Sequence, residues 1–228
     1  MHQLIDKKNK IFIYLLFLFL LSSINNLALN KINFFQLKLN KIFVSGLSKE
    51  SNLQIKNSLN ELMFQNIFMI DSKKIIDILE NNDLIYSYNV KKIYPNSIDI
   101  KIKKAELLAL ISKDGNFFYV GSNGKLVNFK KINYELPFLT GEIEINDIIE
   151  FIKLIKKSKI EYRNITQIYY FQSGRWDIKN KSDILIKLPS ENLIKNLNIA
   201  YKIINEKNFK TKKIIDLRIL NNIILKDE

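Results

Sequence analysis

The chain has 228 residues, of which 47% are hydrophobic and 26% charged, and its formal net charge is +13. It contains no Cys, and its one His is His2. These absences exclude disulfides, thiolate nucleophiles, His-ligated zinc and a Ser-His-Asp triad. We therefore expect a folded, non-enzymatic protein that needs no cofactor and no metal.

The positive charge does not have the character of a nucleic-acid-binding surface. Only Arg163, Arg175 and Arg218 are Arg, and the many Lys residues are spread along the chain. Base and phosphate recognition favours Arg, because its planar guanidinium binds two acceptors at once. We expect no nucleic-acid partner, and a weak attraction to anionic lipid head groups instead.

The N-terminal segment is the most apolar part of the chain. Ile11 to Leu21 is an unbroken apolar run after three Lys residues, and the apolar character weakens at Ser22 to Asn26 before Leu29. Eleven residues fit the core of a cleaved signal peptide, whereas the nineteen residues 11–29 fit a retained membrane span. Both alternatives place residues 1–10 in the cytoplasm and the body outside it. The candidate anchor side chains are Ile11, Leu15, Leu16, Phe19, Leu20 and Leu21.

Residues 38–104 show the pattern of a small α+β module. Alternation at residues 41–46 predicts a strand, and two helices follow, one capped by Ser51 and one capped by Asp71. Residues 84–93 and 97–104 predict two strands joined by a turn, with Ile98, Ile100 and Ile102 facing inward. The order β-α-α-β-β predicts one sheet with both helices on one face.

Residues 105–228 predict a second, β-rich domain of mixed type with two helices. The helices are expected over 146–157 and from a cap at Ser190 to about residue 205. The expected strands cover residues 107–111, 117–120, 125–129, 165–171, 175–178, 183–188, 213–219 and 223–226.

Two motifs in this domain resemble catalytic or ligand-binding patterns. Gly121 to Lys125 has the wrong spacing for a phosphate loop and is expected to be a hairpin turn. The acidic residues Glu142, Glu144, Asp147 and Glu150 either supply paired carboxylates or lie near a helix N-terminus, where the helix dipole favours them. The second interpretation is the simpler one.

Two features are candidates for binding a partner. Arg175 and Trp176 belong to residue types that are enriched at interfaces, although a lone Trp also serves in packing. The final hairpin pairs Ile214–Ile219 with Ile223–Leu225. Its last strand either offers a free edge to an incoming strand or simply closes the core, and periodicity does not choose between these.

The ordered set of motifs along the chain resembles the FtsQ/DivIB family of bacterial division proteins, in particular its alphaproteobacterial members. The residues that carry this resemblance are Val44-Ser45-Gly46, Asn66 to Asp71, Val90 to Pro95, Ile98-Asp99-Ile100, Gly124 to Val127, Leu136 to Gly141, Arg175-Trp176 and Asp216-Leu217-Arg218.

The resemblance implies a single-pass inner-membrane scaffold with a POTRA module, enriched at the division septum. It would retain its anchor, bind FtsB, FtsL and other divisome proteins through the C-terminal strand edge, and help regulate septal peptidoglycan synthesis. The candidate partner-binding residues are Arg175, Trp176, Arg218, Ile219, Ile223, Ile224 and Leu225. The alternatives are a POTRA-containing transport or assembly factor that receives polypeptide clients, and an envelope hydrolase using the acidic residues.

Overall fold

The computed structural model describes residues 7–23, 37–128, 135–206, 208, 211–219 and 222–227. It begins with helix α1 (Lys7–Ser23), whose apolar side chains from Ile11 to Leu21 are 50–71% exposed. In the part of the chain that is described, none of the helices combines the length and apolar character needed to span a membrane. Residues 24–29 of the expected anchor lie outside the described residues.

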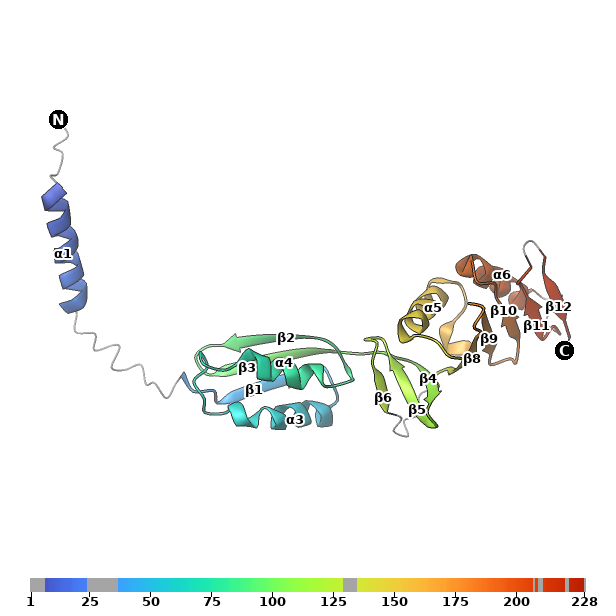
Figure 1. The fold of residues 1–228 in the computed structure, drawn as a ribbon, viewed down its shortest axis with the longest axis horizontal. Coiled ribbons are helices and arrows are strands. Elements are labelled where there is room, and N and C mark those ends of the chain that lie inside the picture. The colour runs from blue at the N-terminus through green and yellow to red at the C-terminus, as the bar shows by residue number, and fades with distance from the viewer. Residues whose placement is uncertain are drawn as a thin grey trace, which may run out of the picture.

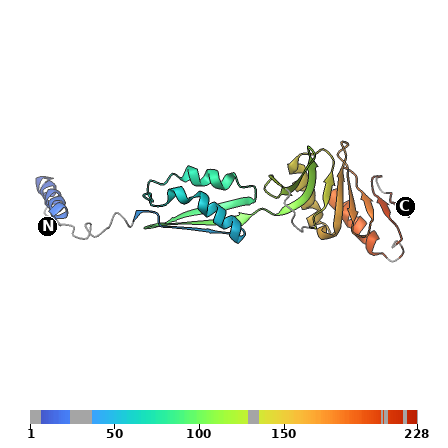
Figure 2. The same cartoon turned by 90° about the horizontal axis from the view of Figure 1, so that it is seen from below.

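The first module confirms the β-α-α-β-β prediction. Its elements are β1 (Lys41–Ser45), α3 (Lys49–Ser58), the 3₁₀ turn η2 (Asn60–Leu62), α4 (Ser72–Glu80), β2 (Ile85–Ile93) and β3 (Ser97–Lys104). The strand order is β1-β3-β2, with β3 parallel to β1 and antiparallel to β2. Both helices cover one face of this sheet (Figure 2), and Ile98, Ile100 and Ile102 are buried beneath them as expected.

Of the two helix caps predicted for this module, one is confirmed and one is wrong. Asp71 caps α4 as expected, because its Oδ1 accepts a hydrogen bond of 2.8 Å from the Lys73 N–H. The cap of α3 is Ser48 rather than Ser51, since the Ser51 N–H donates to Ser48 Oγ at 3.2 Å. The helix ends at Ser58, so that buried Leu59 and Leu62 lie in the turn that follows it.

The second module is a nine-stranded mixed sheet with two helices, α5 (Ile145–Lys157) and α6 (Leu193–Asn205). The strand order is β12-β11-β10-β9-β8-β7-β4-β5-β6. The strands are β4 (Leu107–Lys113), β5 (Asn116–Gly121), β6 (Leu126–Asn128), β7 (Phe138–Thr140), β8 (Ile165–Tyr170), β9 (Trp176–Asn180), β10 (Leu185–Lys187), β11 (Ile214–Asp216) and β12 (Ile224–Lys226). The apolar sides of both helices are buried in the core of this module.

Two details of this module differ from the sequence-based expectation. Strand β7 was missed, although it lies in the middle of the sheet and runs parallel to both β4 and β8. Helix α6 is preceded by Asn192 in the left-handed conformation (φ +56°) rather than capped by Ser190.

The two modules lie end to end (Figure 1), and hydrogen bonds join them at the junction. The Ala105 N–H donates to the Leu84 carbonyl at 2.8 Å. From the β5–β6 turn, Asn123 Nδ2 donates to the carbonyls of Asp83 (2.9 Å) and Ile85 (2.8 Å). One side chain of the second module therefore holds two backbone positions at the end of the first.

Candidate partner-binding edge

Strand β12 forms one end of the nine-stranded sheet. It pairs antiparallel with β11, with Ile215 opposite Leu225 and Asp216 opposite Ile224. Its other side pairs with no strand in the described part of the chain. An edge strand of this kind presents unpaired N–H and C=O groups to an incoming strand.

The predicted side chains at this end of the sheet divide between two faces. Leu225 is half-buried and packs against the core, whereas Ile224 is 37% exposed. Arg218, Ile219 and Ile223 line one groove of about 390 Å³ between the end of β11, the start of β12 and the N-terminal part of α6. The structure thus brings five of the predicted residues together around the edge strand.

A row of residues leads from the middle of the sheet to this edge. The strand registers place Asp177 of β9, Lys187 of β10, Asp216 of β11 and Ile224 of β12 side by side. Charges of opposite sign therefore alternate across neighbouring strands, which stabilises cross-strand pairs. Asp177, Lys187 and Asp216 were not among the predicted partner-binding residues, although each alternates with apolar residues along its strand.

Asp216 is held by a residue two positions further along. Its Oδ1 accepts hydrogen bonds from the Arg218 N–H (3.1 Å) and Nε (2.8 Å), and its Oδ2 accepts one from Nη2 at 2.5 Å. The hydrogen bonds from Arg218 hold the pKa of the Asp216 carboxyl below its usual value. This arrangement explains why Asp and Arg flank Leu217, which is buried in the core.

Arg175 lies in a second groove on the sheet, with a volume of about 580 Å³. Its guanidinium covers the Phe171 ring at 4.0 Å, and its Nε lies 3.4 Å from Oδ1 of buried Asp177. Neither of these two atoms makes a hydrogen bond within the described residues. Burial raises the pKa of the Asp177 carboxyl, against the opposing effect of the Arg175 charge.

Trp176 is placed differently from its neighbour. Its side chain is 6% exposed and stacks on Phe151 of α5, with ring centroids 3.8 Å apart. Because successive side chains of a strand point to opposite faces, Arg175 lines the groove while Trp176 faces the helices. The structure therefore gives Trp176 a packing role and leaves it out of the exposed surface.

The acidic residues near α5 lie at the surface, before the helix and within it. Glu142, Glu144, Asp147 and Glu150 are all exposed, and Asp147 lies in the first turn of the helix. Among the residues described, no group of three or more His, Cys, Asp or Glu side chains is placed to hold a metal ion. The edge strand and the two grooves described above remain the candidate contact surfaces that include predicted residues.

The fold defines a class of protein: two α+β modules in series, the second of which ends in an edge strand that pairs with no further described strand. Residues 37–104 match the family model described as "POTRA domain, FtsQ-type". Residues 104–218 match the one described as "Cell division protein FtsQ/DivIB, C-terminal". The chain belongs to the FtsQ/DivIB family of cell division proteins, which are non-enzymatic components of the divisome.

Curated relatives agree with this assignment. The chain is 27% identical to cell division protein DivIB of Clostridium botulinum (strain Hall) over 88% of its own length and 84% of the relative. It is also 27% identical to cell division protein FtsQ of Rickettsia bellii, over 79% of its length and 69% of the relative. These equal identities do not support the expected alphaproteobacterial lineage over another.

A solved structure was also found among similar folds. It is the major extracytoplasmic domain of DivIB from Geobacillus stearothermophilus, with 16% identity and a TM-score of 0.33, covering 41% of this chain and 85% of that one.

Proposed function

We propose that this protein is a membrane-anchored scaffold of the divisome that binds the FtsB–FtsL pair by adding a strand of FtsB to β12. The observation that carries the proposal is the position of β12 at the end of the nine-stranded sheet, with its outer side free of any described strand. Main-chain hydrogen bonds to such an edge supply affinity, and side-chain pockets beside it supply specificity.

Two grooves near β12 could receive side chains of the partner, one with apolar lining residues and one with an excess of positive charge. The groove lined by Arg218, Ile219 and Ile223 is suited to an apolar side chain with a polar neighbour. The groove that holds Arg175 is also lined by Lys179, Lys187 and Lys213, against the two carboxylates of Asp177 and Asp183. This excess of positive charge favours a partner segment that carries acidic residues.

The anchor is the second part of the proposal. The unbroken apolar run Ile11 to Leu21 accounts for only about 17 Å of helix at 1.5 Å per residue, whereas the nineteen residues 11–29 of the proposed anchor would reach about 28 Å as a helix, close to the ~30 Å hydrocarbon core of a bilayer. The exposed apolar surface of Ile11 to Leu21 supports burial in lipid, with the two modules outside the cytoplasm. Anchoring would confine the scaffold to the membrane surface, where it helps regulate septal peptidoglycan synthesis.

The experiment is complementation in cells depleted of the native protein. Ile223→Asp or Ile224→Asp is expected to give filamentous cells and to lose FtsB–FtsL from material copurified with the tagged chain after crosslinking. Ile194→Asp on α6 is the matched control, because Ile194 and Ile224 are both 37% exposed. Normal division and normal recovery of FtsB with both edge variants would refute the proposed binding site.

A further inference from the structure

We propose that the end of the first module at which the chain enters contacts the membrane directly, through the side chains of Phe64, Phe68, Met69 and Tyr94. We call these four residues the entry tip. The inference rests on the proposed function in one respect, that residues 11–29 anchor the chain in a bilayer. The entry tip would then contact the lipid head groups of the same bilayer that holds the anchor.

The entry tip is a cluster of large, exposed apolar side chains. The exposed fractions are 68% for Phe64, 60% for Phe68, 82% for Met69 and 55% for Tyr94. The Phe68 and Tyr94 rings stack with centroids 4.9 Å apart. The loop before α4, which contains Phe68, and the β2–β3 turn, which contains Tyr94, therefore form one continuous surface. Clustered exposed apolar groups mark an interaction site, and aromatic rings favour the level of the lipid head groups.

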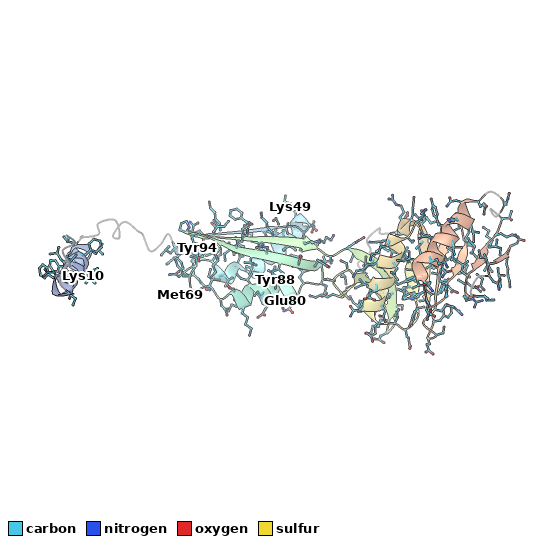
Figure 3. The ribbon with its side chains drawn as sticks, turned by 90° about the horizontal axis from the view of Figure 1, so that it is seen from above. Lys10, Lys49, Met69, Glu80, Tyr88 and Tyr94 are labelled. Atoms are coloured by element: carbon cyan, nitrogen blue, oxygen red, sulfur yellow. The ribbon has the colours of Figure 1, made fainter. Side chains whose placement is uncertain are left out.

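Backbone hydrogen bonds place the entry tip where the chain arrives from the anchor. The Phe64 N–H donates to the Leu39 carbonyl (2.8 Å), and the Ile67 N–H donates to the Leu37 carbonyl (2.9 Å). The Asn40 N–H donates to the carbonyl of Asn96, which belongs to the same turn as Tyr94. Figure 3 shows Met69 and Tyr94 at one end of the module and Lys49 toward the opposite end, next to the second module.

The length of the connecting chain keeps this surface near the membrane. Residues 24–36 separate α1 from Leu37, and at ~3.6 Å per residue they reach about 50 Å at most. The entry tip is therefore held at a high effective concentration next to the bilayer. A weak intrinsic affinity for lipid then suffices for contact.

Backbone conformation and charge also support contact between the entry tip and lipid head groups. Phe64 has φ +64°, a left-handed conformation that aromatic residues rarely adopt, and its side chain is exposed. The three segments of the tip, residues 37–41, 64–71 and 92–97, contain Lys38, Lys41 and Lys92 against one acidic residue, Asp71. This positive balance is attracted to anionic head groups.

The absence of Cys allows a direct test in the full-length chain. A Met69→Cys variant carries one environment-sensitive fluorophore at the tip, and a Lys49→Cys variant carries it at the far end. Both are reconstituted in vesicles of phosphatidylcholine and phosphatidylglycerol that contain a lipid-borne quencher. We expect quenching and blue-shifted emission at position 69 and neither effect at position 49. Vesicles of phosphatidylcholine alone should show weaker quenching at position 69, because they lack the anionic head groups that attract the Lys residues of the tip.

Two substitutions in the Met69→Cys background separate contact from folding. Phe68→Asp is expected to reduce quenching to the level seen at position 49. Tyr86→Asp is the matched control, because Tyr86 is an aromatic residue 50% exposed on β2 near the second module, and it should leave quenching unchanged.

The outcomes distinguish the two proposals. A chain that does not float with vesicles overturns the anchor and the entry-tip contact together. A chain that floats while the fluorophore at position 69 stays in water overturns the entry-tip contact alone. Retained quenching with Phe68→Asp also overturns it, and loss of function in cells without lipid contact would assign the surface to a protein partner.

Discussion

The Arg218 guanidinium closes on the Asp216 carboxylate two residues before it, with Nε 2.8 Å from Oδ1 and Nη2 2.5 Å from Oδ2. This clamp lies directly beside the edge strand, because Asp216 pairs with Ile224 of β12. All three hydrogen bonds from Arg218 require an accepting carboxylate at Asp216, next to the pairing of β11 with β12.

The clamp predicts a pH dependence of stability with a definite sign. The folded-state pKa of Asp216 is below its unfolded value of about 3.9, so its contribution is complete above that value and is lost as pH falls through the folded pKa. We expect Asp216→Asn to lower the free energy of unfolding by about 1–3 kcal/mol at neutral pH. The difference from wild type should shrink on acidification, as measured by urea unfolding. An equal difference at all pH values would contradict the clamp.

Arg175 and Asp177 allow a test that separates stability from binding. Arg175→Ala removes the only cation within 4 Å of buried Asp177 among the described residues and should cost about 1–3 kcal/mol. Because burial already disfavours the charged form of Asp177, adding Asp177→Asn should recover most of that loss. FtsB binding should remain weakened in the double variant. Full recovery of binding would leave Arg175 with a structural role alone.

Trp176 is predicted to report on the core and not on the partner. Trp176→Ala should lower the free energy of unfolding by about 3–5 kcal/mol, because it removes the stack on Phe151. As the chain has one Trp, its fluorescence measures this environment directly. We expect its emission to stay unchanged when partner is added at saturation, and a spectral shift would place Trp176 at the interface.

Gly46 is predicted to be required by the packing of β1 on β3. At φ +115°, a Cβ on Gly46 would lie 1.7 Å from the Ile102 carbonyl oxygen. Gly115 also has a positive φ, but nothing lies within 4 Å of its Cβ position. Gly46→Ala should therefore destabilise by more than about 1 kcal/mol beyond Gly115→Ala in thermal unfolding. Equal losses would show that the backbone conformation alone matters.

Periodicity predicted most of the fold, because apolar residues alternate with polar ones in elements such as β3, where Ile98, Ile100 and Ile102 are buried beneath the helices. Periodicity missed β7 for two reasons. Its three residues are too few to show an alternating pattern, and its partners β4 and β8 are distant in sequence. The prediction that Ser51 caps α3 was wrong, because the helix begins at Lys49 and its cap is Ser48, whose hydroxyl accepts a hydrogen bond from the Ser51 N–H.

The candidate site was predictable only in part. The sequence located the closing hairpin, but its position at the sheet edge depends on the parallel pairing of β10 with β11, which periodicity does not specify. Arg175 and Trp176 could not both belong to one binding surface, because neighbouring residues of an extended strand face opposite sides of the sheet. The exposed side chains of the entry tip lie in a loop and a turn, where no periodic pattern marks them.

The most direct test of the central claim is amide hydrogen exchange of β12 in the presence and absence of the FtsB–FtsL pair. Strand addition would give the outward N–H groups of residues 223–227 new acceptors, so their exchange should slow markedly on binding. The opposite edge strand β6, Leu126–Asn128, is the internal control and should exchange at an unchanged rate. Tight binding with unchanged exchange at β12 would contradict the account.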